Sequence, residues 1–189
     1  PNGRKCALIG ASGANKDNPN LTGEVCETDY FNVMSVVKYI RSDFLMRKEF
    51  GKLNPQENKI PHSLCLHYIV RFCDGDILIL KRDSKLSYHG SRWSFSGEEQ
   101  LSETDFKSSK PIEALFQRAF CEEVLPLVDE DSIDEMWKIA KTIIKNMHVW
   151  SVCIEVEIFN YTLLGIYQLR VDKKEFIKYY TDIINKGIG

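Results

Sequence analysis

The sequence predicts a mixed β-sheet with helices on its faces, that is, an α/β (α+β) sandwich. Residues 151–159 alternate between apolar and polar side chains, a pattern typical of a strand with one buried face. Residues 111–123 and 172–184 place apolar side chains three or four residues apart, as amphipathic helices do. Asp74-Gly75 lies between two apolar segments and indicates a tight hairpin. Strands and helices that alternate in this way pack in layers around one core.

The composition is that of a soluble globular protein. The chain has 189 residues, of which 43% are hydrophobic and 28% are charged, and its formal net charge is −2. This charge gives no general attraction to nucleic acid or to anionic membranes. No apolar run is long enough to span a bilayer, and the first residues lack the apolar segment of a signal peptide. We therefore predict a cytoplasmic protein without a membrane partner.

The cysteines are predicted to be buried and reduced. The chain has six cysteines: Cys6, Cys26, Cys65, Cys73, Cys121 and Cys153. None belongs to a CxxC pair, and most of them lie in apolar segments. The chain begins at Pro1 and ends at Gly189, which suggests that it was processed or is a domain of a longer protein.

The N-terminal part is predicted to form an extension with one helix. Residues 5–9 are apolar enough for a short strand, and glycines follow at positions 10 and 13. A phosphate-binding loop would need a helix directly afterwards, whereas residues 15–20 intervene, so a plain loop is favoured. Thr28-Asp29 is predicted to cap a helix over residues 30–48.

A polar segment with two prolines, residues 54–61, indicates a linker. We therefore assign residues 1–58 to the extension and residues 59–189 to the main domain. The main domain is predicted to begin with strands over residues 63–72 and 76–82, joined by the turn at Cys73-Asp74-Gly75.

Three helices are predicted in the main domain. Pro111 opens the first, because a proline in the first helical turn loses no hydrogen bond. Asp131 or Ser132 caps the second, which extends through residue 144 and is followed by strands over residues 151–159 and 161–171. A capping-box pattern at residues 172–175 opens the third. Its apolar residues either complete the core or pack against a second copy in a homodimer.

The expected core also includes both tryptophans of this region, Trp137 and Trp150. The apolar face of the first helix is formed by Ile112, Leu115, Phe116, Ala119 and Phe120.

The polar side of the first helix carries the most informative charges. Glu122 and Glu123 are consecutive, and Arg118 lies one helical turn before Glu122. Taken alone, these residues fit a solvated helix face with a weak ion pair. A glycine turn at residues 93–97 and an acid-rich segment precede them, however. Clustered carboxylates repel one another unless a cation lies among them, and a hard divalent ion with oxygen ligands is the usual one.

At this point the chain resembles the Nudix hydrolase family. The family motif is G-x5-E-x7-R-E-U-x-E-E-x-G-U, where U is a bulky aliphatic residue, and a W-x-F-P-G turn usually precedes it. Trp93-Ser94-Phe95-Ser96-Gly97 is similar to the turn, and Gly97 followed by Glu103 fits the start of the motif. The later positions R, U, E and E are matched by Arg118, Phe120, Glu122 and Glu123. The resemblance covers roughly residues 64–127.

The resemblance implies an α/β/α sandwich and a Mg²⁺ or Mn²⁺ ion that activates water at a phosphoanhydride. The implied metal ligands are Glu99, Glu103, Glu122 and Glu123. Arg118 would orient a carboxylate and would belong, with Glu122 and Glu123, to the catalytic set. A nucleotide or nucleotide-derived molecule is the implied substrate. The implied substrate-binding residues are Arg82, Arg92 and Trp93.

The chain departs from the motif at three places. Fourteen residues separate Glu103 from Arg118 where the motif has seven, which predicts an inserted loop at 107–110. Ala119 replaces the first glutamate after the arginine, an acid that helps hold the metal in the family. Leu125-Pro126 replaces the final glycine and its neighbour. Glu99 or Asp105 is a candidate for supplying the lost oxygen ligand.

Two functions are consistent with these residues. One is a metal-dependent hydrolase of a nucleoside-diphosphate-linked compound. The other is a Nudix-like domain without catalysis that senses a nucleotide or a protein partner and signals to an effector domain. Of the remaining candidates, His89 lies just before the turn and could reach a ligand, and His67 is expected to be half-buried in a strand. A nucleophilic role for Cys121 is disfavoured, because no base accompanies it.

Overall fold

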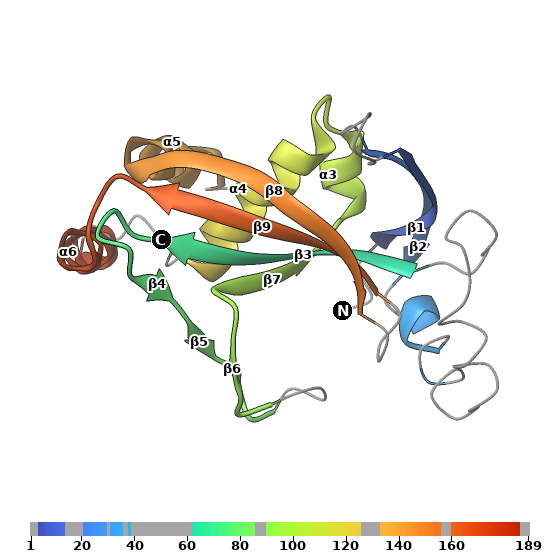
Figure 1. Ribbon diagram of the computed structural model, residues 1–189, viewed down its shortest axis with the longest axis horizontal. Helices are drawn as coiled ribbons and strands as arrows, with labels where there is room; N and C mark the ends of the chain where they lie inside the picture. Colours follow the sequence, from blue (N-terminus) through green and yellow to red (C-terminus); the bar gives the residue numbers. More distant parts are fainter. Residues whose placement is uncertain are drawn as a thin grey trace. The chain divides into compact units, whose positions relative to one another are not determined.

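The computed structural model describes residues 4–13, 21–29, 31–35, 38, 62–85, 90–125, 133–155 and 160–185 (Figure 1). The chain divides into two compact units, which are described separately. The first unit comprises Pro1–Cys65, Gln100–Pro111 and Val152–Thr162. The second comprises Leu66–Glu99, Ile112–Ser151 and Leu163–Gly189. The protein thus combines helices with a multi-stranded sheet, as the sequence predicts.

The first unit contains an antiparallel pair of strands, β1 (Arg4–Gly13) and β2 (Leu21–Asp29). The predicted strand at residues 5–9 is confirmed, but the loop predicted at residues 10–13 is wrong. Those residues continue β1 and pair with β2, Gly13 opposite Leu21. Strand β1 also pairs through Ala7 and Leu8 with the first residues of β3 (His62–Arg71).

A helical segment at residues 31–35 follows β2. The Asp29 carboxylate accepts a hydrogen bond of 2.7 Å from the Asn32 backbone N–H, as expected for a helix N-cap. This part of the predicted helix is therefore confirmed. Most of its remaining length, and the predicted boundary between residues 58 and 59, lie outside the described residues.

A short helix, α3 (Glu103–Lys107), occupies the first unit just before the segment predicted as an inserted loop. Ser102 and Asp105 close a capping box at its start, with Asp105 Oδ2 accepting hydrogen bonds from the Ser102 N–H and hydroxyl at 2.9 and 2.8 Å. Asp105 is buried. This carboxylate is therefore used to begin α3.

In the second unit, β3 continues beside β4 (Ile77–Leu78), β7 (Gly97–Gln100) and β9 (Asn160–Leu169), and β8 (Ile144–Glu155) lies next to β9. Within this unit β9 lies between β3 and β8, and β4 and β7 also pair with β3. The arrows of β3 and β9 point the same way in Figure 1, whereas β3 and β4 are antiparallel, so the sheet is mixed. Strands β5 (Leu80–Lys81) and β6 (Trp93–Ser94) form a separate two-stranded ribbon.

The predicted hairpin between the first two main-domain strands is confirmed. Val70 lies opposite Leu78 and Arg71 opposite Ile77. Gly75 has a φ of 96°, a conformation that other residues rarely adopt, and its N–H donates to the Phe72 carbonyl.

The three predicted main-domain helices are present as α4 (Pro111–Glu123), α5 (Ile133–Ile143) and α6 (Lys173–Asn185). The capping box of α6 is confirmed, because Asp172 and Glu175 exchange backbone-to-carboxylate hydrogen bonds. Phe176 and Ile183 of α6 are buried, whereas Ile177 is exposed. The homodimer remains a prediction. No helix within the described parts of the chain combines the length and the apolar character needed to cross a membrane.

The core of the second unit is built around Tyr167 on β9. Its ring packs within about 5 Å of the rings of Tyr68, Phe116 and Phe120, centroid to centroid. Its hydroxyl donates to the Phe116 carbonyl at 2.5 Å. These contacts fix α4 against β3 and β9.

Three expectations about burial need correction. Trp150 on β8 is 76% exposed, so its predicted place in the core is wrong. Ile112 is exposed at the start of α4. All six cysteines are free, but Cys73 and Cys153 are exposed, whereas burial is confirmed for Cys6, Cys65 and Cys121.

Candidate functional site

The glycine turn and α4 are held together through Tyr68 of β3. The Tyr68 hydroxyl donates a hydrogen bond of 2.9 Å to the Ala119 carbonyl on α4. A Cβ atom on Gly97 would lie 2.0 Å from the same hydroxyl oxygen, so only glycine fits at this close approach. This packing places the acids that follow Gly97 next to the polar side of α4.

Arg118 joins the two groups of acids. Its Nη1 atom lies 3.1 Å from Glu99 Oε1 on β7 and 2.9 Å from Glu122 Oε2 one helical turn away. The three side chains are 16%, 15% and 24% exposed respectively. Ion pairs at this depth are less screened than surface pairs, so Arg118 orients both carboxylates. The predicted proximity of the turn and the helix is therefore present.

A second arginine engages the neighbouring acid of β7. Arg82 forms an ion pair with Glu98, and the Ser94 hydroxyl donates to Glu98 Oε1 at 2.6 Å. Burial acts to raise the pKa of Glu98, but the hydrogen bonds from Ser94 and Arg82 outweigh it, and the pKa lies below its usual value. Glu98 is therefore ionised at neutral pH.

Glu123 differs from the other three acids. Among the described residues its carboxylate makes no hydrogen bond or ion pair. Its side chain keeps exposed surface, yet partial removal from water and repulsion from Glu99, Glu122 and Glu98 raise its pKa. Glu123 is thus the member whose negative charge is least compensated.

We call these four glutamates and two arginines the carboxylate cluster: Glu98, Glu99, Glu122, Glu123, Arg82 and Arg118. Four carboxylates and two guanidinium groups meet in this cluster, and the carboxylate of Glu123 is repelled by the other three acids. The oxygen donors suit Mg²⁺ or Mn²⁺ in chemical type. However, no three His, Cys, Asp or Glu side chains in the described part of the chain are grouped so that they could hold a metal ion.

Ala119 shows why the site lacks one acid. Its side chain is completely buried, and its carbonyl accepts the hydrogen bond from Tyr68. An acid at this position would enter the core beneath the cluster unless the surrounding packing changed.

Within the described part of the chain, the side chains of the remaining predicted site residues form none of the ion pairs of the carboxylate cluster. Glu103 belongs to the first unit, where its carboxylate pairs with Lys107 and with Arg4. Trp93 and Arg92 lie at the β5–β6 ribbon of the second unit, and both are exposed. His89 lies outside the described residues.

Sequence reasoning missed three members of this region: Tyr68, Ser94 and Glu98. Tyr68 lies among apolar residues in β3, so its sequence pattern indicates a core residue. Glu98 has no basic neighbour in the sequence, and only the pairing of β5 with β6 brings Arg82 near it. His67 is half-buried, as predicted, with its ring 5.5 Å from that of Phe95, and burial lowers its pKa. Burial also raises the pKa of Cys121 to about 12, with a further contribution from Glu122, which argues against a nucleophilic thiol.

Comparison of the chain with models of known protein families gives no match, and comparison with curated proteins gives none either.

Proposed function

We propose that the second unit is a Nudix-like recognition domain that binds a nucleotide or a nucleotide-derived molecule without hydrolysing it. The observation that carries this proposal is the engagement of Arg118 with both Glu99 and Glu122. The Arg118 guanidinium group forms ion pairs with both carboxylates. The buried Ala119 supplies no side-chain oxygen that could act as a further metal ligand. Charge compensation inside the protein therefore takes the place that a catalytic metal has in the family.

The β5–β6 ribbon supplies groups of the kind that nucleotides need. Trp93 is 66% exposed and stands opposite Lys81, which is also exposed. Arg92 precedes Trp93 and is exposed as well. An exposed indole offers a flat surface on which a base can stack, and the two cations can contact phosphates.

Isothermal titration calorimetry with ADP and with a nucleotide sugar tests this proposal. We expect measurable binding without Mn²⁺ and no turnover with it. Trp93→Ala should weaken binding about 5- to 150-fold if a base stacks on the indole. Trp150→Ala is the matched control, because Trp150 is also exposed but lies on β8. Equal losses in the two variants, or no binding of either compound, would refute the proposal.

One observation favours the second candidate, a metal-dependent hydrolase. Glu123 makes no ion pair among the described residues and is repelled by the three other acids of the cluster. A divalent ion that arrives already bound to a diphosphate would offset the negative charge of Glu123. This candidate requires release of phosphate-bearing products from dinucleotides, nucleotide sugars or triphosphates in the presence of Mg²⁺ or Mn²⁺.

The hydrolase candidate has a clear mutational test. Glu123→Gln should abolish metal-dependent turnover, while Glu113→Gln, at an exposed position of the same helix, should retain it. An absence of turnover across the whole panel would leave the recognition domain as the supported function. A sensor of this kind would act on an effector domain or a protein partner, which would then be the next component to identify.

A further inference from the structure

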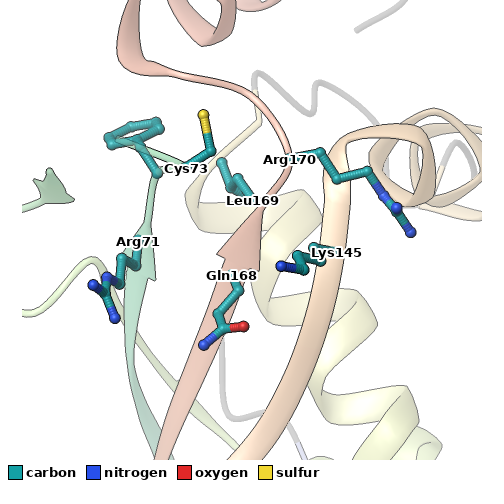
Figure 2. Close-up of a pocket in the computed structure, with 7 residues that line it drawn as sticks. Arg71, Cys73, Lys145, Gln168, Leu169 and Arg170 are labelled. Carbon is teal, nitrogen blue, oxygen red and sulfur yellow. The ribbon is translucent and has the colours of Figure 1, made fainter. Parts of the chain in front are cut away.

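A cationic pocket lies in the second unit at the ends of β3, β8 and β9. Its volume is about 390 Å³, and seven residues line it: Arg71, Phe72, Cys73, Lys145, Gln168, Leu169 and Arg170. Figure 2 shows Gln168 and Lys145 extending from neighbouring strands, with Arg71 and Arg170 at the two sides. None of the residues of the carboxylate cluster contributes to this lining.

Strand alternation explains why polar groups line the pocket. Along β9, Leu169 is buried with the aromatic core, so Gln168 faces the other side of the sheet. Along β3, Val70 and Phe72 are buried in the same way, so Arg71 also points outward. Lys145 comes from the start of β8, which lies next to β9.

The charges in the pocket have one sign. Arg71, Lys145 and Arg170 are cationic, and none of the described residues that line the cavity carries a carboxylate. The nearby hairpin residue Asp76 is engaged by Lys173 at 2.7 Å, which compensates its charge. Three cations border this concave surface, with Arg71 and Arg170 at its two sides (Figure 2), so the local charge is positive although the chain as a whole is slightly negative.

The polar side chains of the pocket have free bonding capacity. Within the described residues, the side chains of Arg71, Lys145 and Gln168 make no hydrogen bond or ion pair. Arg170 donates one hydrogen bond from Nε to the Ile144 carbonyl at 3.2 Å, which fixes its position and leaves its terminal nitrogens available.

We propose that the cationic pocket binds a small molecule that carries a phosphate or pyrophosphate group. Guanidinium and ammonium groups donate charge-assisted hydrogen bonds to phosphate oxygens, and the Gln168 amide adds a neutral donor. The cavity has the size of a small-molecule site.

The test is calorimetric titration of the whole chain with inorganic pyrophosphate, supported by circular dichroism to verify folding. We expect Lys145→Gln to weaken pyrophosphate binding about tenfold or more, and Arg71→Gln to do the same, because each removes a charge-assisted contact. Both residues are exposed, so the variants should fold normally. Lys138→Gln is the control, since Lys138 is an exposed lysine on α5 outside the pocket.

Several results would overturn the proposal. Unchanged binding in the two pocket variants, or an equal loss in Lys138→Gln, would show only non-specific attraction. An absence of pyrophosphate binding, together with Lys145-dependent binding to vesicles that contain phosphatidic acid, would assign the pocket to a lipid surface instead. Trp93→Ala separates this pocket from the proposed nucleotide site, because it should leave pyrophosphate binding intact; loss of binding in Trp93→Ala alone would place the anion at the ribbon.

Discussion

The carboxylate cluster and the cationic pocket use charge in opposite ways within the same unit. In the cluster, Arg118 is paired with Glu99 and Glu122, and Arg82 with Glu98. In the pocket, three cations line a cavity to which no carboxylate of the described residues contributes. The first arrangement orients its own charged groups, and the second leaves charge available to a ligand. The two regions therefore differ in whether their charged groups are paired with one another, as in the cluster, or make no ion pair among the described residues, as in the pocket.

Depth separates the two regions as well. The Arg118 and Glu99 side chains are 16% and 15% exposed, whereas Arg71 and Lys145 are exposed. Removing one partner of a buried pair leaves an uncompensated charge in a poorly solvated place. Removing an exposed cation leaves nothing unsatisfied. Mutations should therefore change the stability of the protein in the cluster and its ligand binding in the pocket.

The largest effect is expected from Ala119→Glu, which would push a carboxylate into a completely buried position. We expect a loss of about 3–5 kcal/mol in the free energy of unfolding, because a buried charge without a partner is strongly unfavourable. Denaturant unfolding measures this loss, with Ala114→Glu on the half-buried side of the same helix as the control. A stable Ala119→Glu variant that gains Mn²⁺-dependent turnover would instead identify the chain as an enzyme that lost one ligand.

A smaller effect is expected from Arg118→Gln. Comparison of this variant with Arg71→Gln tests the difference between the cluster and the pocket directly. Loss of the shared guanidinium leaves Glu99 and Glu122 facing each other, and we expect about 2–3 kcal/mol of destabilisation. Arg71→Gln should change stability by less than about 0.5 kcal/mol. Thermal unfolding of the two variants checks the comparison. Similar melting temperatures for both would mean that the Arg118 pairs are as solvated as surface pairs.

A still smaller effect, opposite in sign, is expected from Glu123→Gln. The folded-state pKa of Glu123 lies above its ordinary value of 4.5, so the native state holds this proton more tightly than the unfolded chain does. That contribution to stability is complete below the ordinary pKa and is lost as the pH rises through the folded-state pKa. At pH 7 the glutamine should therefore stabilise the fold, by no more than about 0.5 kcal/mol because the exposed carboxyl is screened.

The pH dependence of melting provides the measurement for Glu123→Gln. The gain in melting temperature over the original chain, about 1–2 °C at neutral pH, should shrink as the pH is lowered toward 4. A gain that grows on acidification would contradict the assigned direction of the pKa shift.

The smallest effect on stability is expected from chemical modification of two cysteine thiols, one in the pocket and one on the helix that carries part of the cluster. Cys73 lines the pocket and is exposed, whereas Cys121 is buried on α4 with its pKa raised to about 12. Cys73 should react with a thiol reagent at least roughly a hundredfold faster than Cys121, with little change in melting temperature. Peptide mapping by mass spectrometry distinguishes the two sites. Pyrophosphate should slow the labelling of Cys73 alone if it binds in the pocket.

Local sequence rules predicted much of the second unit. The turn at Gly75, the start of α4 at Pro111 and the capping box of α6 are all present. Each depends on neighbours within a few residues, which the sequence displays directly. In the first unit, the N-cap at Asp29 was predicted for the same reason, while β2 was missed because a strand is defined by a partner that is distant along the chain.

The sequence by itself determined the mixed helix-and-sheet class, the order of the three main-domain helices and the chemical character of the acids near Gly97 and α4. Only the tertiary structure decided which charges are paired. It placed Arg118 between Glu99 and Glu122, buried Ala119, and assembled the cationic pocket from Arg71, Lys145 and Gln168 on three strands. The physical reason is that ion pairing and burial depend on distances between segments, whereas helix caps and turns depend on local backbone geometry.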